Sequence, residues 1–262
     1  MNQFWDRCIR RATELAAGDS PPKELLTFYA KLLHAQKEIY EELRSHQGWL
    51  PSGSLDHDLS ILKKSFPKLL DVVVQVGPPH LADEARTLAG SADGVIEELL
   101  FNYWKSPSDT QFFAKAFLQP YARWLAVSGG RPSHRNVVPQ ENRCPFCGGR
   151  PQVSCLLNRE PSAESGNRDL VCATCLTSWQ FRRVVCASCL EERPFKLGYF
   201  QAEEYDHVRV ETCDTCKRYI KGIDLTRLGL AVPLVDEVGA AALDIWAQQR
   251  GYQKIELNLL GL

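Results

Sequence analysis

Four Cys-x-x-Cys pairs lie within one 73-residue stretch of this 262-residue chain, and they constrain the fold more than any other feature. Two thiolates from one tight turn and two from a distant turn can surround a soft cation tetrahedrally, at about 2.3 Å. We therefore expect this stretch to fold around metal. The eight cysteines are Cys144, Cys147, Cys172, Cys175, Cys186, Cys189, Cys213 and Cys216.

The four pairs repeat as two units. The first pair is separated from the second by 24 residues, and the third from the fourth by 23. In each unit an Arg-Pro step, Arg150-Pro151 or Arg193-Pro194, leads into an apolar segment that can pair as a strand. Such a repeat predicts two similar supersecondary units laid end to end. The repeat favours metal sites that each use two Cys-x-x-Cys turns (knuckles) adjacent in sequence. The alternative is a cross-braced arrangement, in which the first and third knuckles share one metal ion.

Each predicted site has a closed shell of sulfur. Four thiolates leave no open position for a substrate or water, so the site is structural or, with iron, an outer-sphere electron carrier. Tetrahedral sulfur suits both metals, and we expect two metal ions per chain, iron or zinc. The alternative is a disulfide framework, which paired cysteines in a reducing cytosol rarely form. Cys8 and Cys155 lie outside the pairs and are expected to be buried thiols.

The residue after each knuckle differs between the four pairs. Gly148 suits a turn that needs positive φ, so that backbone N–H groups can point at sulfur. The corresponding residues Leu176, Leu190 and Lys217 are expected to fit this turn less well.

Charge and hydropathy argue against membrane insertion and against nucleic-acid binding. No stretch approaches about 18 uncharged apolar residues, and the first residues lack the apolar region of a signal peptide. We therefore expect a cytoplasmic protein without membrane insertion. The net charge is −1, and the formal +2 of residues 143–222 would fall to about −2 with two divalent tetrathiolate centres. Without a basic surface, no nucleic-acid partner is expected.

The hydrophobic period changes near Gly129-Gly130, from helical upstream to alternating downstream. The sequence thus predicts an α+β fold with two tandem four-cysteine ribbons. The expected parts are a helical N-terminal domain (1–130), a linker (131–142), the first four-cysteine module (143–185), the second four-cysteine module (186–224) and a C-terminal helical segment (225–262).

Three local signals refine the helices. Ser20 is a plausible N-cap. Pro233 is predicted to begin a single helix that runs past Trp246 and stops at Gly251. An aromatic stripe before the linker is predicted to be helix-bundle core instead of a ligand groove. Its members are Phe112, Phe113, Phe117, Tyr121 and Trp124.

The order of these motifs resembles the formate dehydrogenase accessory protein, the FdhE family. The residues that carry the resemblance are Cys144-Pro-Phe-Cys147-Gly148, the run from Glu211 to Asp224, Asp236-Glu-Val, Leu243 to Ala247, Gly251-Tyr252 and, less specifically, Leu118 to Ala122.

The resemblance implies a cytoplasmic, chaperone-like maturation factor with two rubredoxin-like modules. Such a factor would bind the catalytic subunit of a respiratory formate dehydrogenase before export, and its Cys knuckles would matter for that contact. The metal ligands it implies are Cys144, Cys147, Cys172 and Cys175 in one module, and Cys186, Cys189, Cys213 and Cys216 in the other.

Two other functions compete with this one. A rubredoxin-like electron carrier would use iron in the same cages, and a zinc-ribbon protein could bind nucleic acid. A thiol–disulfide oxidoreductase needs one reactive pair at a helix N-terminus, which four ribbon-like pairs do not provide. We therefore predict that the chain is not an enzyme.

Overall fold

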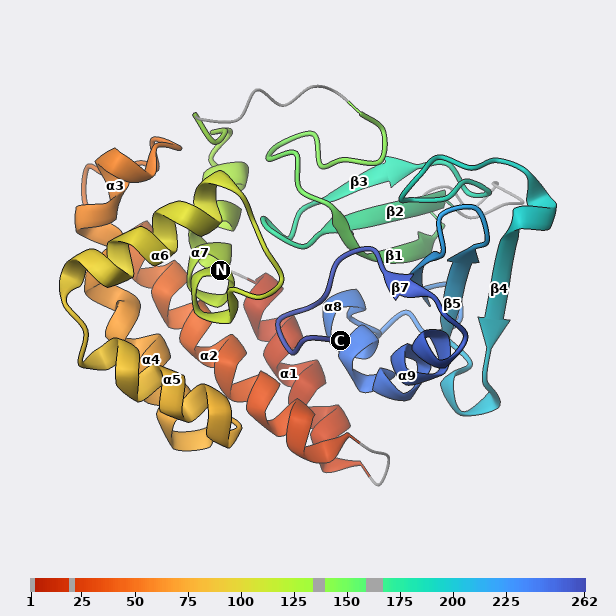
Figure 1. Ribbon diagram of the computed structural model, residues 1–262, viewed down its shortest axis with the longest axis horizontal. Coiled ribbons are helices and arrows are strands. Elements are labelled where there is room, and N and C mark those ends of the chain that lie inside the picture. Colours follow the sequence, from red (N-terminus) through yellow and green to blue (C-terminus); the bar gives the residue numbers. More distant parts are fainter. Residues whose placement is uncertain (1–2, 19–21, 134–139, 159–166) are drawn as a thin grey trace.

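The computed structural model describes residues 3–18, 22–133, 140–158 and 167–262, and there a helical half precedes a sheet. Figure 1 shows these helices on the left and the sheet on the right. Two of the helices have a proline in their first turn. Proline is tolerated there because N–H groups of the first turn have no acceptor within the helix, so the missing N–H costs no hydrogen bond. The helices are α1 (Gln3–Ala17), α2 (Lys23–Ser45), α3 (Leu55–Leu62), α4 (Phe66–Val76), α5 (Pro79–Ala89), α6 (Asp93–Lys105) and α7 (Phe112–Val127). The expected cap Ser20 lies outside the described residues.

α7 forms the centre of the helical half because most of its side chains are buried. Phe113, Phe117 and Tyr121 are each at most 1% exposed. The Phe117 ring packs edge-on against Phe66 of α4, with 4.9 Å between the ring centroids. Burying one such ring stabilises the fold by about 1.5–3 kcal/mol relative to leaving it in water. The prediction that this aromatic stripe is core is confirmed.

The second half of the chain forms one sheet that contains both Cys units. Its strand order is β3-β2-β1-β6-β5-β4, with β7 beside β6. The strands are β1 (Pro151–Leu157), β2 (Asn167–Cys172), β3 (Ser178–Phe181), β4 (Leu197–Gln201), β5 (Val208–Cys213), β6 (Arg218–Asp224) and β7 (Gln253–Lys254).

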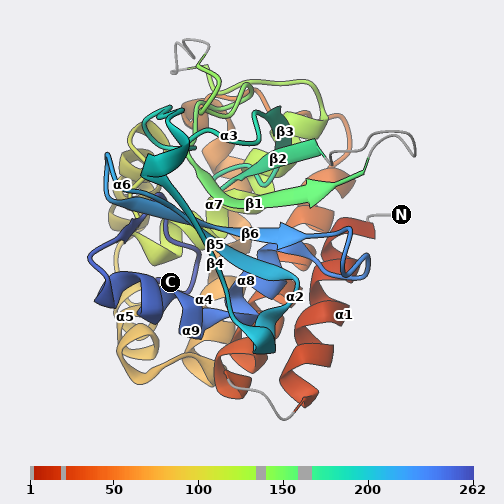
Figure 2. The same ribbon diagram turned by 90° about the vertical axis from the view of Figure 1, so that its right-hand side faces the viewer.

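Each Cys unit supplies three antiparallel strands, and a parallel pair joins the two units. β1 pairs with β6 in a register that sets Cys155 opposite Ile223. Figure 2 shows β1 and β6 side by side in the middle of the sheet, with helices behind them. The two repeats therefore share a single continuous sheet.

The C-terminal segment folds as two helices, α8 (Pro233–Gly239) and α9 (Ala241–Gln249), so the prediction of one continuous helix is wrong. Ala240 leaves the helical conformation, with φ −98° and ψ 40°. The buried Lys221 ammonium explains the break, because it donates to the carbonyls of Glu237 and Ala240. The helix ends where this side chain satisfies carbonyls that a continuing helix would have bonded.

The α+β fold class, with a helical N-terminal half, two four-cysteine units on a sheet and C-terminal helices, is confirmed. Among the described helices, none has the length and apolar composition that a membrane span requires. The boundaries at 130, 142, 185 and 224 stay predictions, and residues 134–139 of the expected linker lie outside the described part of the chain.

Candidate metal centres

The first cluster gathers Cys144, Cys147, Cys172 and Cys175, all buried. The first two lie in the turn before β1, Cys172 ends β2, and Cys175 lies in the turn that leads to β3. The Sγ atoms of Cys144 and Cys175 are 3.5 Å apart, as are those of Cys147 and Cys172. The hairpin of β1 and β2 brings the two knuckles together because its strands run antiparallel.

These sulfur positions fit a tetrahedral metal ion. Four sulfurs at about 2.3 Å from a common centre lie about 3.8 Å from one another, whereas a disulfide needs about 2.05 Å. The backbone at Gly149 lies close to two of these sulfur atoms. A Cβ atom on Gly149 would lie 2.8 Å from the Sγ of Cys172 and 3.3 Å from that of Cys147. The chain thus approaches the sulfurs as closely as a glycine permits.

The second cluster repeats this arrangement nearer to solvent. It consists of Cys186, Cys189, Cys213 and Cys216. Sγ atoms are 3.7 Å apart in the pairs Cys186–Cys216 and Cys189–Cys213. Cys189 is exposed and Cys216 is half-buried, unlike every cysteine of the first cluster.

All four knuckles adopt the same backbone turn. φ is 69° at Gly148, 56° at Leu176, 64° at Leu190 and 54° at Lys217. The turn aims backbone N–H groups at sulfur: the Thr174 N–H lies 3.3 Å from the Sγ of Cys172. Ser188 makes the matching contact to Cys186, also at 3.3 Å. The three non-glycine residues adopt the same positive φ as Gly148, which strains a residue with a Cβ, in agreement with the expectation that they fit this turn less well.

The helical half holds the first cluster through α7. Gln119 donates from Nε2 to the carbonyl of Ala173, between the two cysteines of the second knuckle, at 2.8 Å. Arg123 donates from Nη1 to the carbonyl of Leu176 at 2.9 Å. Sequence reasoning missed both contacts. The available signal is that each polar side chain interrupts an otherwise apolar helix, which favours a buried hydrogen-bonding role.

A buried ion-pair network joins the two Cys units across the sheet. Glu211 of β5 accepts hydrogen bonds from Arg168 of β2, Arg209 and Ser154 of β1. Burial acts to raise the pKa of Glu211, but the two arginines outweigh it and hold the pKa below its ordinary value. Gly222 leaves room for this contact, since a Cβ there would lie 2.6 Å from the Glu211 carboxylate. The two modules are therefore coupled by charge as well as by strand pairing.

The remaining cysteines lie away from both clusters. Cys8 on α1 and Cys155 on β1 are buried. Burial raises the pKa of the Cys8 thiol to about 12, so this side chain stays protonated at neutral pH. Its environment suits a small apolar side chain more than a ligand.

Comparison with known proteins places this chain in a family. Residues 184–260 match the family model described as FdhE, C-terminal domain. A protein named "Protein FdhE homolog" from Aquifex aeolicus (strain VF5) is 32% identical over 209 residues, covering 79% of this chain and 72% of that protein. The chain belongs to the FdhE family. The resemblance inferred from the motifs is confirmed.

Other family members align along nearly the whole chain. A "Protein FdhE homolog" from Glaesserella parasuis serovar 5 (strain SH0165) is 26% identical over 282 aligned positions, covering 97% of this chain and 88% of that protein. The crystal structure of the FdhE protein from Pseudomonas aeruginosa matches with a TM-score of 0.69 at 24% identity. It covers 99% of this chain and 96% of that one, and it shows the same fold.

Proposed function

We propose that this member of the FdhE family is an accessory factor for the maturation of respiratory formate dehydrogenase. In this proposal it binds the catalytic subunit in the cytoplasm, performs no catalysis itself, and holds two metal ions, iron or zinc. The proposed ligands are the four cysteines of each cluster. Their sulfurs fit closed tetrahedral sites, which stabilise a surface and do not activate water.

The observation that carries the proposal is that similarity to FdhE proteins extends over the helical half as well as the Cys units. A small electron carrier or a nucleic-acid-binding ribbon needs only the metal modules. A factor that recognises a folding protein needs additional surface. About half of this chain forms helices, and one of them, α7, donates hydrogen bonds to the second knuckle of the first cluster.

The second Cys unit offers a surface suited to a protein partner. Within the described residues β4 pairs only with β5, so its other edge is available for pairing. Phe195 is 76% exposed, and Tyr199 and Phe200 on β4 are 46% and 40% exposed. Aromatic side chains of this kind are enriched at protein interfaces. Leu197 lies opposite Cys213, so the second cluster fixes the position of this surface.

The test is co-purification of the tagged full chain from native cells, with the bound proteins identified by mass spectrometry. We expect the catalytic subunit of formate dehydrogenase with the wild type, and much less of it with Phe195→Ser or Tyr199→Ser. Leu230→Ser is the matched control, because Leu230 is 81% exposed but lies outside the second unit. Recovery of RNA or DNA in place of the subunit contradicts the proposal.

An electron carrier is the second candidate, and the exposure of Cys189 favours it. Outer-sphere transfer is fastest when a ligand sulfur reaches the surface, and Cys189 does so. Iron in freshly purified protein, with a red ferric-thiolate spectrum and reversible reduction, would support this candidate. Colourless protein with two zinc ions per chain would exclude it.

A further inference from the structure

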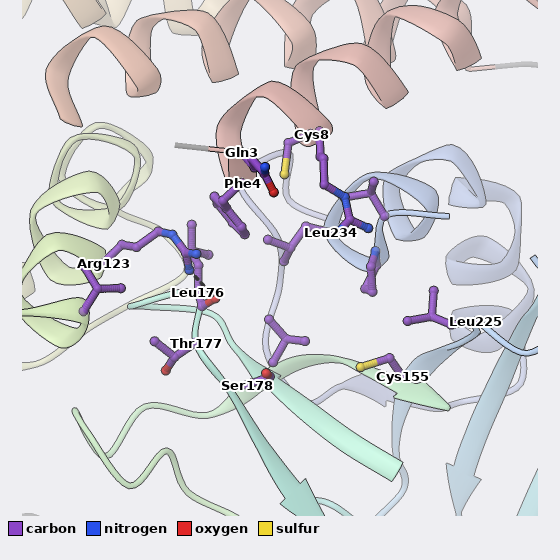
Figure 3. A pocket seen from close by; sticks show the side chains of 15 residues that line it. Gln3, Phe4, Cys8, Arg123, Cys155, Leu176, Thr177, Ser178, Leu225 and Leu234 are labelled. Carbon is purple, nitrogen blue, oxygen red and sulfur yellow. Dashed lines mark hydrogen bonds between the residues drawn. The ribbon is translucent and has the colours of Figure 1, made fainter. Parts of the chain in front are cut away.

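A pocket of about 610 Å³ lies between the helical half and the sheet (Figure 3). Its walls come from α1, α7, the turn before β3, the strands β1 and β2, and the start of α8. Most of the lining is apolar, including Phe4, Val171 and Leu234. The volume falls in the range of about 300–1,000 Å³ that is typical of small-molecule sites.

The pocket contains a poorly compensated arginine. Figure 3 shows the Arg123 side chain extending from α7 toward Leu176 and Phe4. Its Nη1 donates to the Leu176 carbonyl, and its guanidinium carbon lies 3.4 Å from the centroid of the Phe4 ring. Its Nε is buried without a hydrogen-bond acceptor. Burial lowers the pKa of this guanidinium from its ordinary value, which reflects the cost of removing the charge from water.

The residues that line the pocket supply no counter-charge. Arg7 adds a second positive side chain at the rim, and the described lining includes no aspartate or glutamate. Neither arginine forms an ion pair with a carboxylate of the described residues. The Cys8 thiol is protonated at neutral pH. Cys175 of the first cluster attracts Arg123 from outside the cavity.

We propose that this pocket binds a small molecule with an apolar body and one carboxylate group. The Nη1 and Nη2 groups at the end of the Arg123 side chain can donate to carboxylate oxygens, a geometry that arginine matches well, whereas Nε is closed off from the cavity. The apolar walls fit an alkyl or aromatic body. A doubly charged phosphate is less suited, because only one arginine of the lining is even partly buried and desolvating a second negative charge is costly. The proposal is independent of the formate dehydrogenase function.

Isothermal titration calorimetry on the metal-loaded full chain tests this site, with decanoate as the probe and decanol as its uncharged counterpart. We expect saturable binding of one decanoate per chain and much weaker binding of decanol. Arg123→Gln should weaken decanoate binding by roughly tenfold, the value of one charge-assisted hydrogen bond. Val127→Trp should also weaken it, because this half-exposed residue of the wall would fill the space.

Two further variants distinguish a ligand site from a structural arginine. Arg7→Gln should weaken binding by a few-fold, whereas Arg10→Gln, the same charge change on the same helix outside the lining, should leave it unchanged. If decanoate does not bind, or binds no better than decanol, the proposal is wrong. It is equally wrong if Arg123→Gln loses metal from the first cluster while decanoate affinity is unaltered, since Arg123 would then serve only the Cys knuckle.

Discussion

Arg11 of α1 and Asp236 of α8 are joined by a two-pronged ion pair, although 225 residues separate them in the chain. Arg11 Nε lies 3.0 Å from one carboxylate oxygen and 3.2 Å from the other. Asp236 also accepts from the backbone N–H of Val232 at 2.7 Å and lies 2.9 Å from Nε2 of His207. One carboxylate thus ties the first helix, the sheet and the C-terminal helices together.

This junction predicts a pH-dependent stability that originates at His207. The Asp236 hydrogen bond raises the pKa of His207 above its ordinary value, so between about pH 6.5 and that raised value the folded state binds more protons than the unfolded state. The free energy of unfolding should therefore fall as pH rises through this window. Urea denaturation of wild type and His207→Gln at about pH 6 and about pH 8.5 measures the effect.

The variant should be less stable than wild type at the lower pH, and the gap should shrink at the higher pH. His80→Gln on α5 is the control, since His80 is exposed and its loss should leave the pH profile of wild type intact. An unchanged gap across the range would falsify the assignment of this linkage to His207.

A second prediction concerns four charged side chains that are almost fully buried between β6, β7 and the C-terminal helices. Lys221, Lys254, Glu237 and Asp244 have side chains at most 1% exposed. Removing one partner from such a group leaves a buried charge without compensation, at a cost of about 3–5 kcal/mol. Lys221→Met should lower the free energy of unfolding by about this amount.

The matched control is Lys63→Met, which removes an exposed lysine that bonds Asp93 at 2.9 Å and Glu97 at 3.1 Å. Surface pairs of this kind contribute about 0–1 kcal/mol. Chemical denaturation of both variants measures the contrast. Similar losses in the two variants would show that burial does not determine the effect.

The difference in exposure between the two clusters predicts two phases of metal loss. A coloured chelator should remove one metal equivalent quickly from the second cluster, where Cys189 is exposed, and one slowly from the buried first cluster. Cys189→Ser should abolish the fast phase and Cys147→Ser the slow phase, with each variant retaining about one ion. Single-phase release of both ions from wild type would show that the ion-pair network couples the clusters fully.

The Cys grouping can be predicted from sequence because one hairpin brings the two knuckles of each unit together. The parallel pairing of β1 with β6 lies beyond such local reasoning. Val153 and Lys221 are register partners across 68 residues, and the crossover between them contains the whole second unit up to β6. A repeated motif predicts similar units, and it carries no information on whether their strands join.

The buried charges are also poorly predicted, although one of them has a signal. Lys221 alternates with Tyr219 and Ile223 along β6, and this period of two places the lysine on the core face. Its partners Glu237 and Asp244 lie on helices whose break depends on Lys221 itself. Local helix signals from Pro233 onward therefore predict one helix, because the interaction that divides it comes from a distant strand.

The knuckle turns provide the last prediction, at Lys217. Its φ of 54° is strained for a residue with a Cβ, at a cost of about 1 kcal/mol that glycine avoids. Lys217→Gly and Lys217→Ala both lose the ion pair with Asp214 at 2.5 Å, but only alanine retains the strain. The glycine variant should therefore be the more stable of the two, by up to about 1 kcal/mol in thermal denaturation of the metal-loaded protein. At Gly148, where φ is 69°, Gly148→Ala should be destabilising for the same reason. If the alanine variant is at least as stable as the glycine variant, the positive φ at position 217 does not destabilise the metal-bound turn.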